Sequence, residues 1–362
     1  LHISFNDNSE GGGIYFYLND FTKIQKKSGI DCHWITIKNN NKIFTRKEFL
    51  KKITKIKPNI IHIHGIWNLA TRTIPQLKII TKNIIVSPHG MLNKESFSKS
   101  YLRKRISLQY LKKKLYFILF EKRYLKQIEY FHALTEAESN EIKCFFPEKP
   151  IKIIRSGFKG VHSKVNYNCN KNLKNIFQKP HKILLFMSRL DQGKGLIELM
   201  SAWNQIVYQA EFYNWSLLIA GFGNLKKQVI SNASKSNSRI IFNGPIFGDE
   251  KNFILQNSKG FILPSYNEGL PISVLEALSF KTTCLISESC NINKLIDSNI
   301  ALQININKKS NNIKESLLKL FELSEKDLKE REESGLKYLE NNHKWEKILY
   351  ETDIFYKDLC KA

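Results

Sequence analysis

The chain has 362 residues, of which 42% are hydrophobic and 25% charged, so it is long enough for two domains with separate cores. No apolar run approaches the roughly 18 residues of a membrane span. The six cysteines are scattered and include no Cys-x-x-Cys pair, which argues against zinc or a disulfide framework and favours a reducing cytoplasm. The chain opens on a strand-like segment without a signal peptide, and its first residue, Leu1, indicates a trimmed or partial start.

The net charge of +24 is unevenly distributed along the chain. Residues 1–200 carry 37 Lys and Arg against 14 Asp and Glu, whereas residues 201–362 carry 20 against 19. A basic half attracts an anionic partner, which leaves a lipid surface, a phosphorylated acceptor and nucleic acid as alternatives. Because no zinc finger, ribonucleoprotein motif or basic zipper is present, nucleic acid is not expected as a partner.

Two series of strands alternate with helical segments along the sequence. The strand runs are nearly all apolar, as in parallel strands that are covered on both faces. The alternation predicts an α/β protein with two doubly wound domains, residues 1–165 and 166–342, joined in the polar segment 166–175. Strands are expected at 1–5, 32–37, 59–64, 83–87, 130–134 and 151–154, and then at 181–188, 215–220, 239–242, 260–263, 282–286 and 300–304.

In the first half, Gly11, Gly12 and Gly13 follow the first strand, where missing Cβ atoms let a backbone approach a phosphate. A tight turn is the alternative. His62 and His64 share a face of one strand, but with no third ligand in sight a metal site is not expected. The segment 94–127 mixes basic and apolar residues, which suits a helix on anionic lipid or a solvated charged face. Its expected membrane-contact residues are Arg103, Lys104, Arg105, Lys112, Lys113 and Lys114.

In the second half, Arg189 and Lys194 flank a glycine-rich turn after a strand and suit a diphosphate, although an Asp191–Lys194 pair in a solvated turn would also explain them. Glu268 lies in a loop before a helix that opens at Pro271, and such a helix end favours anions. Lys251 is expected on a helix surface, with a contact in the cleft as the alternative.

The ordered set of motifs resembles the retaining glycosyltransferases of the GT-B fold, specifically family four, the group 1 transferases. The resemblance rests on GGG at 11–13, HIHGIW from 62, SPHGML from 87, SRLDQGKG from 188, GFG from 221, NGPI from 243 and the acidic pair in 268–276. It implies two Rossmann-like domains that face each other across a cleft, with a last helix, residues 343–362, that packs back on the first domain. Arg155, Ser156 and Gly157 depart from the Pro-Asn-Gly that the family often has.

The resemblance also implies roles for individual residues. Arg189 and Lys194 would neutralise the leaving diphosphate, Glu276 would accept hydrogen bonds from ribose, and His89 would lie beside the donor sugar, unless it is a structural histidine. The expected site residues are then His89, Glu268, Arg189 and Lys194, with donor contacts from Gly12, Gly13, Gly221, Gly223, Gly269, Leu270 and Glu276 and acceptor-side contacts from His64 and Trp67.

The sequence therefore predicts a metal-independent hexosyltransferase without a cofactor, which uses a nucleoside diphosphate sugar and a glycan acceptor that is expected to be lipid-linked. The resemblance implies that the transfer proceeds with retention. Its expected place is the cytoplasm, at the inner face of a bacterial cell membrane, in the synthesis of surface polysaccharide or lipopolysaccharide. The alternatives are a sugar-nucleotide epimerase or hydrolase on the same fold, a non-enzymatic basic protein that binds nucleic acid or membrane, and an inactive homologue that acts as a scaffold.

Overall fold

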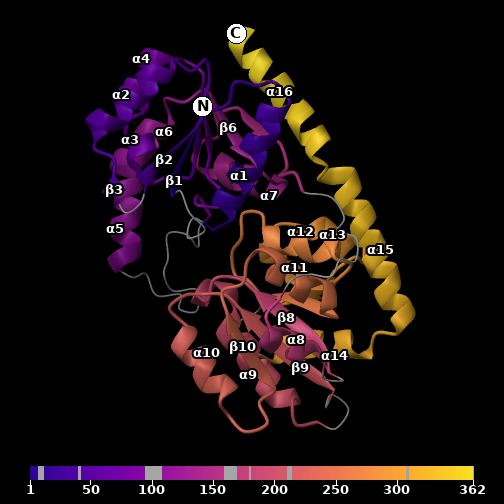
Figure 1. The fold of residues 1–362 in the computed structure, drawn as a ribbon. Coiled ribbons are helices and arrows are strands. Elements are labelled where there is room, and N and C mark those ends of the chain that lie inside the picture. The colour runs from indigo at the N-terminus through magenta and orange to yellow at the C-terminus, as the bar shows by residue number, and fades with distance from the viewer. Residues whose placement is uncertain are drawn as a thin grey trace. The chain divides into compact units, whose positions relative to one another are not determined.

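A computed structural model describes residues 1–6, 12–39, 42–93, 108–158, 169–178, 181–209, 214–306 and 310–361 (Figure 1). The chain divides into two compact units, residues 1–159 with 343–362, and residues 160–342. The junction predicted after residue 165 lies outside the described residues.

The first unit is built on a seven-stranded sheet in the order β3-β2-β1-β4-β5-β6-β7. All neighbours are parallel except β3, which pairs antiparallel with β2. The six predicted strands are confirmed to within two residues, whereas the two-residue strand β3 has no pattern that would predict it. The strands are β1 (His2–Asn6), β2 (Trp34–Asn39), β3 (Lys42–Ile43), β4 (Ile61–His64), β5 (Ile84–Ser87), β6 (Tyr130–Ala133) and β7 (Ile151–Ile153).

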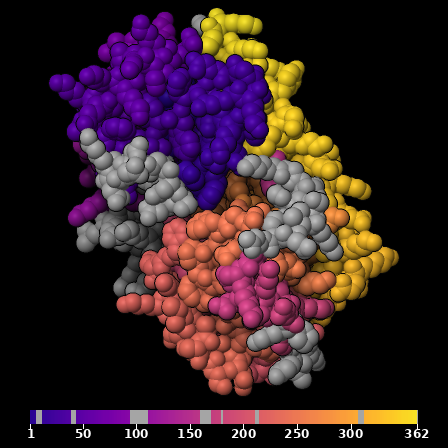
Figure 2. All heavy atoms as spheres, viewed as in Figure 1, coloured from indigo at the N-terminus to yellow at the C-terminus, as the bar shows by residue number. Residues whose placement is uncertain are grey.

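Helices from both ends of the chain cover this sheet. The C-terminal helix buries Trp345, Ile348 and Phe355 against Leu18 and Phe21 of the first helix, and its yellow spheres lie against those of the first unit in Figure 2. The helices of the unit are α1 (Gly12–Lys27), α2 (Arg46–Ile56), α3 (Leu69–Arg72), α4 (Ile74–Ile80), α5 (Leu108–Tyr116), the π-helix η3 (Phe117–Glu121), α6 (Lys122–Leu125), α7 (Glu136–Phe145) and α16 (Trp345–Lys361).

The turn at Arg155–Gly157, where the sequence departs from the family pattern, anchors this returning segment. A Cβ atom on Gly157 would lie 2.1 Å from the Trp345 ring, and the Ser156 carbonyl accepts a hydrogen bond from His343 Nδ1 at 2.8 Å. Glycine is therefore required here by packing against α16.

The second unit has six parallel strands in the order β10-β9-β8-β11-β12-β13. The predicted strands are again confirmed to within two residues. In this order β8 lies near the centre of the sheet, between β9 and β11. The strands are β8 (Lys182–Met187), β9 (Trp215–Ala220), β10 (Ile240–Gly244), β11 (Gly260–Leu263), β12 (Thr283–Ser287) and β13 (Leu302–Ile304). The helices are α8 (Lys171–Gln178), η4 (Gln192–Lys194), α9 (Leu196–Ile206), α10 (Lys226–Ala233), α11 (Gly248–Asn257), α12 (Ile272–Ser279), η6 (Glu288–Cys290), α13 (Asn293–Asp297), α14 (Ser310–Glu322) and α15 (Glu325–Asn342).

Across the described ranges, no helix combines the length and the apolar character that crossing a bilayer requires.

Candidate functional site

The carboxyl ends of β9, β8 and β11 gather most of the predicted donor-site residues of the second unit. Gly221 and Gly223 follow β9, Arg189 and Lys194 follow β8, and Glu268 follows β11. These three strands are neighbours in the sheet. Ligands of open parallel sheets bind at this edge, so the topology brings together residues that are far apart in the sequence.

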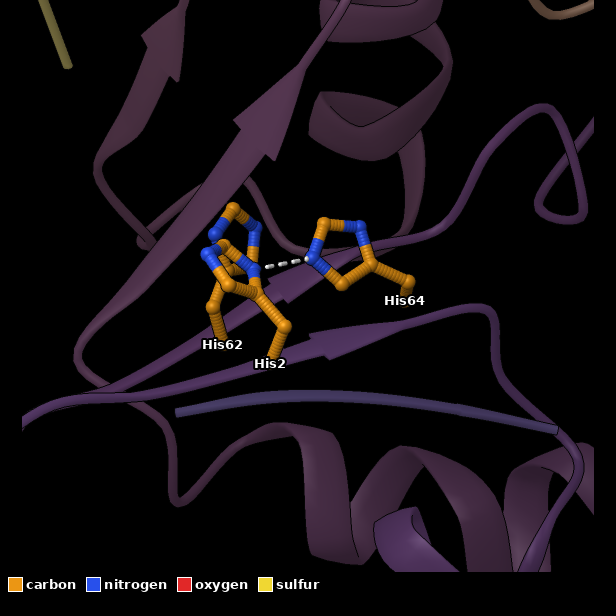
Figure 3. Close-up of side chains that lie close together, drawn as sticks. All are labelled: His2, His62 and His64. Atoms are coloured by element: carbon orange, nitrogen blue, oxygen red, sulfur yellow. Dashed lines mark hydrogen bonds between the residues drawn. The ribbon is translucent and has the colours of Figure 1, made fainter. Parts of the chain in front are cut away.

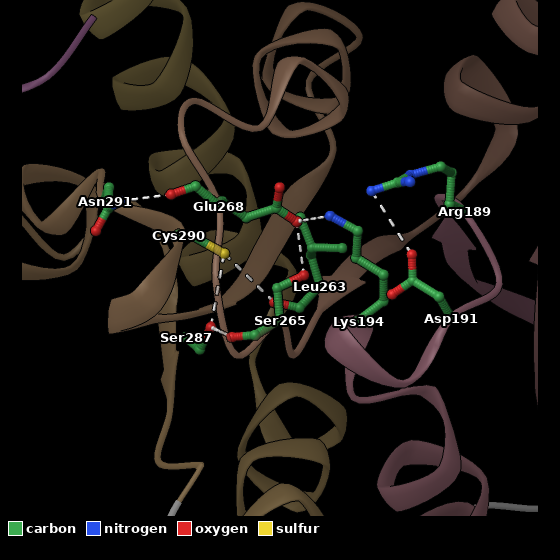
Figure 4. Close-up of polar contacts among 9 residues, drawn as sticks. All are labelled: Arg189, Asp191, Lys194, Leu263, Ser265, Glu268, Ser287, Cys290 and Asn291. Atoms are coloured by element: carbon green, nitrogen blue, oxygen red, sulfur yellow. Dashed lines mark hydrogen bonds and ion pairs between the residues drawn. The ribbon is translucent and has the colours of Figure 1, made fainter. Parts of the chain in front are cut away.

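Lys194 and Glu268 form the most enclosed ion pair of this edge. Lys194 Nζ lies 2.6 Å from Glu268 Oε1, and the two side chains are 11% and 12% exposed (Figure 4). Ser265 Oγ donates to the same oxygen at 2.6 Å, and Asn291 Nδ2 donates to the Glu268 carbonyl. The Tyr266 N–H donates to the Gly193 carbonyl at 2.8 Å. The loop after β11 is thus fixed to the loop after β8.

A second ion pair joins α11 to α12. Lys251 Nζ lies 2.6 Å from Glu276 Oε1, with side chains that are 23% and 21% exposed. Lys251 thus lies on a helix, as expected, but its ammonium is held against Glu276 and is largely shielded from solvent. The glutamate of an otherwise apolar helix is held by a lysine 25 positions earlier, which no local pattern could reveal.

Arg189 is far more exposed than Lys194, with 62% of its side chain accessible. Arg189 Nη2 lies 3.6 Å from Asp191 Oδ2. Asp191 thus pairs with the arginine, and the alternative Asp191–Lys194 pair is wrong because Lys194 turns toward Glu268. A planar guanidinium with most of its surface in water is available to an anion that approaches this edge.

Three glycines allow the loops to cross closely. A Cβ atom on Gly221 would lie 1.9 Å from the Ser188 carbonyl oxygen, and one on Gly223 would lie 2.4 Å from that of Leu190. Gly195 has a φ of +65°, and its Cβ atom would lie 2.0 Å from the Pro264 carbonyl oxygen. Packing thus suffices to explain these glycines, and a donor contact by Gly221 and Gly223 stays a prediction.

The turn that leads into α12 directly follows Glu268, one partner of the Lys194–Glu268 pair. Pro271, the expected first helical residue, is the N-cap with φ and ψ of −76° and 96°, so the helix begins one residue later, at Ile272. Gly269 and Leu270 lie in the turn between Glu268 and this cap and are half-buried. Their predicted contact with donor phosphates stays a prediction.

The first unit contains a pocket of about 270 Å³ at the ends of β1 and β4. Both residues predicted on the acceptor side, His64 and Trp67, line it. The other lining residues combine aromatic, aliphatic and small polar groups, namely Ser4, Phe5, Ile14, Tyr15, Gly65, Ile66, Asn68 and Met91. Such a mixture is typical of small-molecule sites.

Gly12 and Gly13 open α1, and Gly12 has a φ of +61° with no atom within 4 Å of an added Cβ. Gly11 lies outside the described residues. His89, two residues after the end of β5, also has a positive φ, +53°. The roles of Gly12, Gly13 and His89 toward a donor stay predictions.

Buried histidines lie side by side on β1 and β4. The possible ligand atoms of His2, His62 and His64 lie within 4.8 Å of one another (Figure 3). The expectation that His62 and His64 have no third candidate ligand is therefore wrong. His62 bonds to Tyr356 and Ser87, and His2 bonds through both ring nitrogens as well. A metal would have to displace these bonds, so the rings fit a hydrogen-bonded cluster better than a metal centre.

Two buried carboxylates, which the sequence analysis did not single out, bind backbone N–H groups of the loops that follow β4, β5 and β6. Glu138 accepts hydrogen bonds from the N–H groups of Gly90 and Leu134, each at 2.8 Å, and burial raises its pKa. Glu121 of the π-helix accepts the Trp67 N–H at 2.8 Å, and burial raises its pKa too. The pattern Thr135-x-x-Glu138 is a capping signal, but nothing in it indicates the bond to Gly90.

The basic segment is partly described. Arg103, Lys104 and Arg105 lie outside the described residues, whereas Lys112, Lys113 and Lys114 are exposed on α5. Apolar side chains about half exposed accompany them on α5 and η3, namely Leu111, Leu115, Ile118, Leu119 and Phe120. This mixed surface is referred to below as the α5–η3 patch.

Comparisons with known proteins agree with this architecture. Residues 170–335 match the family described as "Glycosyl transferases group 1". The curated protein "Uncharacterized glycosyltransferase MJ1607" of Methanocaldococcus jannaschii is 26% identical over 183 residues, which are 48% of this chain and 46% of that protein. The chain is thus matched to less than half the length of this relative.

Solved structures match over nearly the whole chain. Sucrose-phosphate synthase of Thermosynechococcus elongatus has a TM-score of 0.76 at 15% identity, covering 99% of this chain and 98% of its own. A UDP-forming trehalose-phosphate synthase of Burkholderia xenovorans has a TM-score of 0.72 at 12% identity, with 99% of both chains covered. WaaG, a glycosyltransferase involved in lipopolysaccharide biosynthesis, has a TM-score of 0.67 at 12% identity, with 98% and 99% covered.

The two sheets, one parallel and one parallel except for β3, the returning α16 and these similarities lead to one conclusion. The chain has the GT-B fold, and its residues 170–335 match the model of the family described as "Glycosyl transferases group 1".

Proposed function

We propose that the protein transfers a hexosyl group from a nucleoside diphosphate sugar to a hydroxyl group of a glycan acceptor, and that the second unit holds the donor. The observation that carries the proposal is the Lys194–Glu268 pair at the carboxyl ends of β8 and β11, within the segment that matches the group 1 family.

The chemistry of this edge suits a leaving diphosphate. In the transfer, a bond forms between the acceptor oxygen and the anomeric carbon, while the bond from that carbon to the phosphate oxygen breaks. The acceptor proton and the bonding electrons pass to the departing nucleoside diphosphate. Lys194 and Arg189 would stabilise its growing negative charge, as fixed cations do in such sites. In this proposal the transfer proceeds with retention and needs neither a metal nor a cofactor.

The nucleoside end of the donor would reach Glu276. The carboxylate of Glu276 is oriented by Lys251 and would accept hydrogen bonds from the two ribose hydroxyl groups. Gly269 and Leu270, which lie between Glu268 and α12, would supply backbone N–H groups to the phosphates.

The acceptor sugar would bind in the pocket of the first unit. Tyr15 and Trp67 offer aromatic faces for a sugar ring, and Ser4 and Asn68 offer hydrogen-bonding groups for its hydroxyls. In this assignment His64 and Trp67, the two residues predicted on the acceptor side, contact the same sugar.

The α5–η3 patch supports a lipid-linked acceptor. Its lysines attract anionic headgroups while its half-exposed apolar side chains enter the boundary of the acyl chains. On this basis we propose that the protein acts at the inner face of the cell membrane. WaaG, which shares the fold, acts in lipopolysaccharide biosynthesis.

A panel of sugar nucleotides, screened by the shift in melting temperature, tests the donor class, because a ligand that binds the folded state stabilises it. UDP sugars belong in the panel, since a structural neighbour is UDP-forming. Stabilisation by at least one sugar nucleotide, and by the matching nucleoside diphosphate, is expected. No shift with any member would contradict the proposal.

Labelled donor distinguishes transfer from its closest rival. Turnover that requires a glycan acceptor supports the transferase, whereas equal turnover without acceptor supports an epimerase or hydrolase. The two experiments together separate the absence of donor binding from a different use of the donor.

A further inference from the structure

Four side chains of the first unit form a continuous hydrogen-bonded chain that ends at His89. Gln25 Oε1 lies 2.8 Å from His2 Nε2, His2 Nδ1 lies 2.9 Å from His64 Nε2, and His64 Nδ1 lies 3.0 Å from His89 Nε2. Gln25, His2 and His64 are 1%, 3% and 1% exposed, whereas His89 is half-buried. This hydrogen-bonded series therefore runs from the interior of the first unit to its surface.

The glutamine sets the direction of this chain. Its Oε1 can only accept, and the Cys32 thiol donates to the same atom at 3.1 Å, which is consistent with an oxygen at this position. His2 must then carry its proton on Nε2, so its Nδ1 accepts from His64 Nε2–H. By the same step, His64 Nδ1 accepts from His89 Nε2–H.

Each ring carries one proton, which makes the deduction possible. Burial lowers the pKa of His2 and of His89 to about 3. It also lowers the pKa of His64 well below its usual value, and the neighbouring imidazoles act in the same direction. At neutral pH the three rings are neutral, and a neutral imidazole has one donor and one acceptor nitrogen.

We infer that Gln25 is a positioning residue that fixes His89 in the Nε2–H tautomer through His2 and His64. The lone pair on Nδ1 of His89 is then held as an acceptor for a hydroxyl group of the sugar substrate. The substrate part of this inference rests on the proposed function, whereas the tautomer part rests on the first unit alone.

A second series of hydrogen-bonded side chains in the same cluster provides a matched control. Tyr356 OH lies 2.6 Å from His62 Nδ1, His62 Nε2 lies 2.7 Å from Ser87 Oγ, and Ser87 Oγ lies 2.6 Å from His132 Nδ1. His132 Nε2–H donates to the Ile154 carbonyl at 2.8 Å, which fixes the direction of this chain. Tyr356→Phe thus removes a part-buried hydrogen bond near His2 but leaves the hydrogen-bonded series from Gln25 to His89 intact.

Nitrogen-15 NMR of histidine-labelled protein tests the tautomer directly. In the wild type and in Tyr356→Phe, His89 Nδ1 should resonate as an unprotonated nitrogen. Gln25→Met replaces the amide oxygen by a thioether, a much weaker acceptor, so His2 should donate through Nδ1 instead, and the order of donors and acceptors should reverse from His2 to His89. His89 Nδ1 should then move toward the position of a protonated nitrogen. An unchanged His89 in Gln25→Met, or a protonated Nδ1 in the wild type, would overturn the inference.

The wild type decides the matter if Gln25→Met does not fold. Scalar couplings across N–H···N hydrogen bonds identify the donor nitrogen. The proton should reside on His64 Nε2 in the bond to His2, and on His89 Nε2 in the bond to His64. Protons on the opposite nitrogens would refute the direction set by Gln25.

A double-mutant cycle in glycosyl transfer tests the link to substrate. Gln25→Met should lower kcat/KM about tenfold, the order expected for one hydrogen bond, and should have no further effect in a His89→Ala background. Tyr356→Phe should change kcat/KM equally in both backgrounds. A fall in kcat/KM that persists without His89 would show that Gln25 acts elsewhere. If the wild type transfers no sugar at all, the proposed function fails while the NMR result still decides the tautomer.

Discussion

Lys194 and Glu268, which are 74 residues apart in the sequence, meet at 2.6 Å where β8 and β11 end side by side. The carboxylate also accepts from Ser265, so the lysine is held in place before any ligand binds. An ammonium has three N–H donors, which leaves Lys194 able to bind an anion while it keeps its bond to Glu268.

This pairing predicts a coupling free energy between the two side chains. Lys194→Met should lower the free energy of unfolding by about 2 kcal/mol, because a largely buried carboxylate loses its cation. Glu268→Gln in the same chain should restore at least half of the loss. Urea unfolding of the single and double variants measures this. Lys259→Met, which removes a lysine paired with the exposed Glu325, is the control and should change stability by less than about 0.5 kcal/mol. Strictly additive effects of the two substitutions would contradict the coupling.

Two glycines with similar backbone angles should respond differently to alanine. Gly195 and Gly248 have φ values of +65° and +55°. An added Cβ on Gly195 would lie 2.0 Å from the Pro264 carbonyl oxygen, whereas none of the neighbouring atoms lies within 4 Å of one on Gly248. Gly248→Ala should therefore cost only backbone strain, about 1 kcal/mol. Gly195→Ala should cost several times more and should also weaken nucleotide binding. Equal losses in urea unfolding would show that close packing at Gly195 is not required.

The buried histidines predict a loss of stability in mild acid. The folded-state pKa is about 3 for His2 and about 4 for His132, below the unfolded value of about 6.5. Their stabilising contribution is thus complete above pH 6.5 and is lost as the pH falls below it, because the unfolded chain then binds more protons. The raised pKa of Glu138 acts in the opposite sense at lower pH. The unfolding free energy should fall by about 1 kcal/mol per pH unit for each such histidine.

Urea unfolding between pH 7.5 and 5.5 measures this slope. His132→Gln should reduce the slope, since the unfolded chain then takes up about one proton fewer on unfolding in this pH range. A free energy of unfolding that stays constant over the interval would show that the rings are not buried as neutral groups.

The α5–η3 patch predicts binding to anionic vesicles. Ile118→Ser with Leu119→Ser should weaken the partition of the protein onto phosphatidylglycerol vesicles by about tenfold or more, because each removes apolar surface from the bilayer boundary. Ile79→Ser is the matched control, since Ile79 is 85% exposed on α4, outside the patch. Sedimentation with vesicles should show weaker binding at high salt and none to neutral phosphatidylcholine. Equal partition of the patch variant and the control would rule out this surface.

The strands were predictable because apolar runs mark parallel strands whatever their partners are. Glu268 and Glu276 could be singled out because one precedes a helix N-terminus, the other lies in an otherwise apolar helix, and the two form the acidic pair of the family resemblance. The partners of these residues could not be predicted in the same way. Lys251 reaches Glu276 only because α11 and α12 pack together, and His2 joins His64 only because β1 and β4 are neighbours in the sheet. Such contacts depend on strand order, which no local pattern specifies.

Isothermal titration of nucleoside diphosphates into the wild type, Lys194→Met and Lys259→Met tests the central claim most directly. We expect at least one nucleoside diphosphate to bind the wild type and Lys259→Met equally, and to bind Lys194→Met at least tenfold more weakly, since hydrogen bonds to charged groups contribute about 1.5–3 kcal/mol. Equal affinity in all three proteins, or no binding to the wild type, would contradict a donor site at the carboxyl ends of β8 and β11.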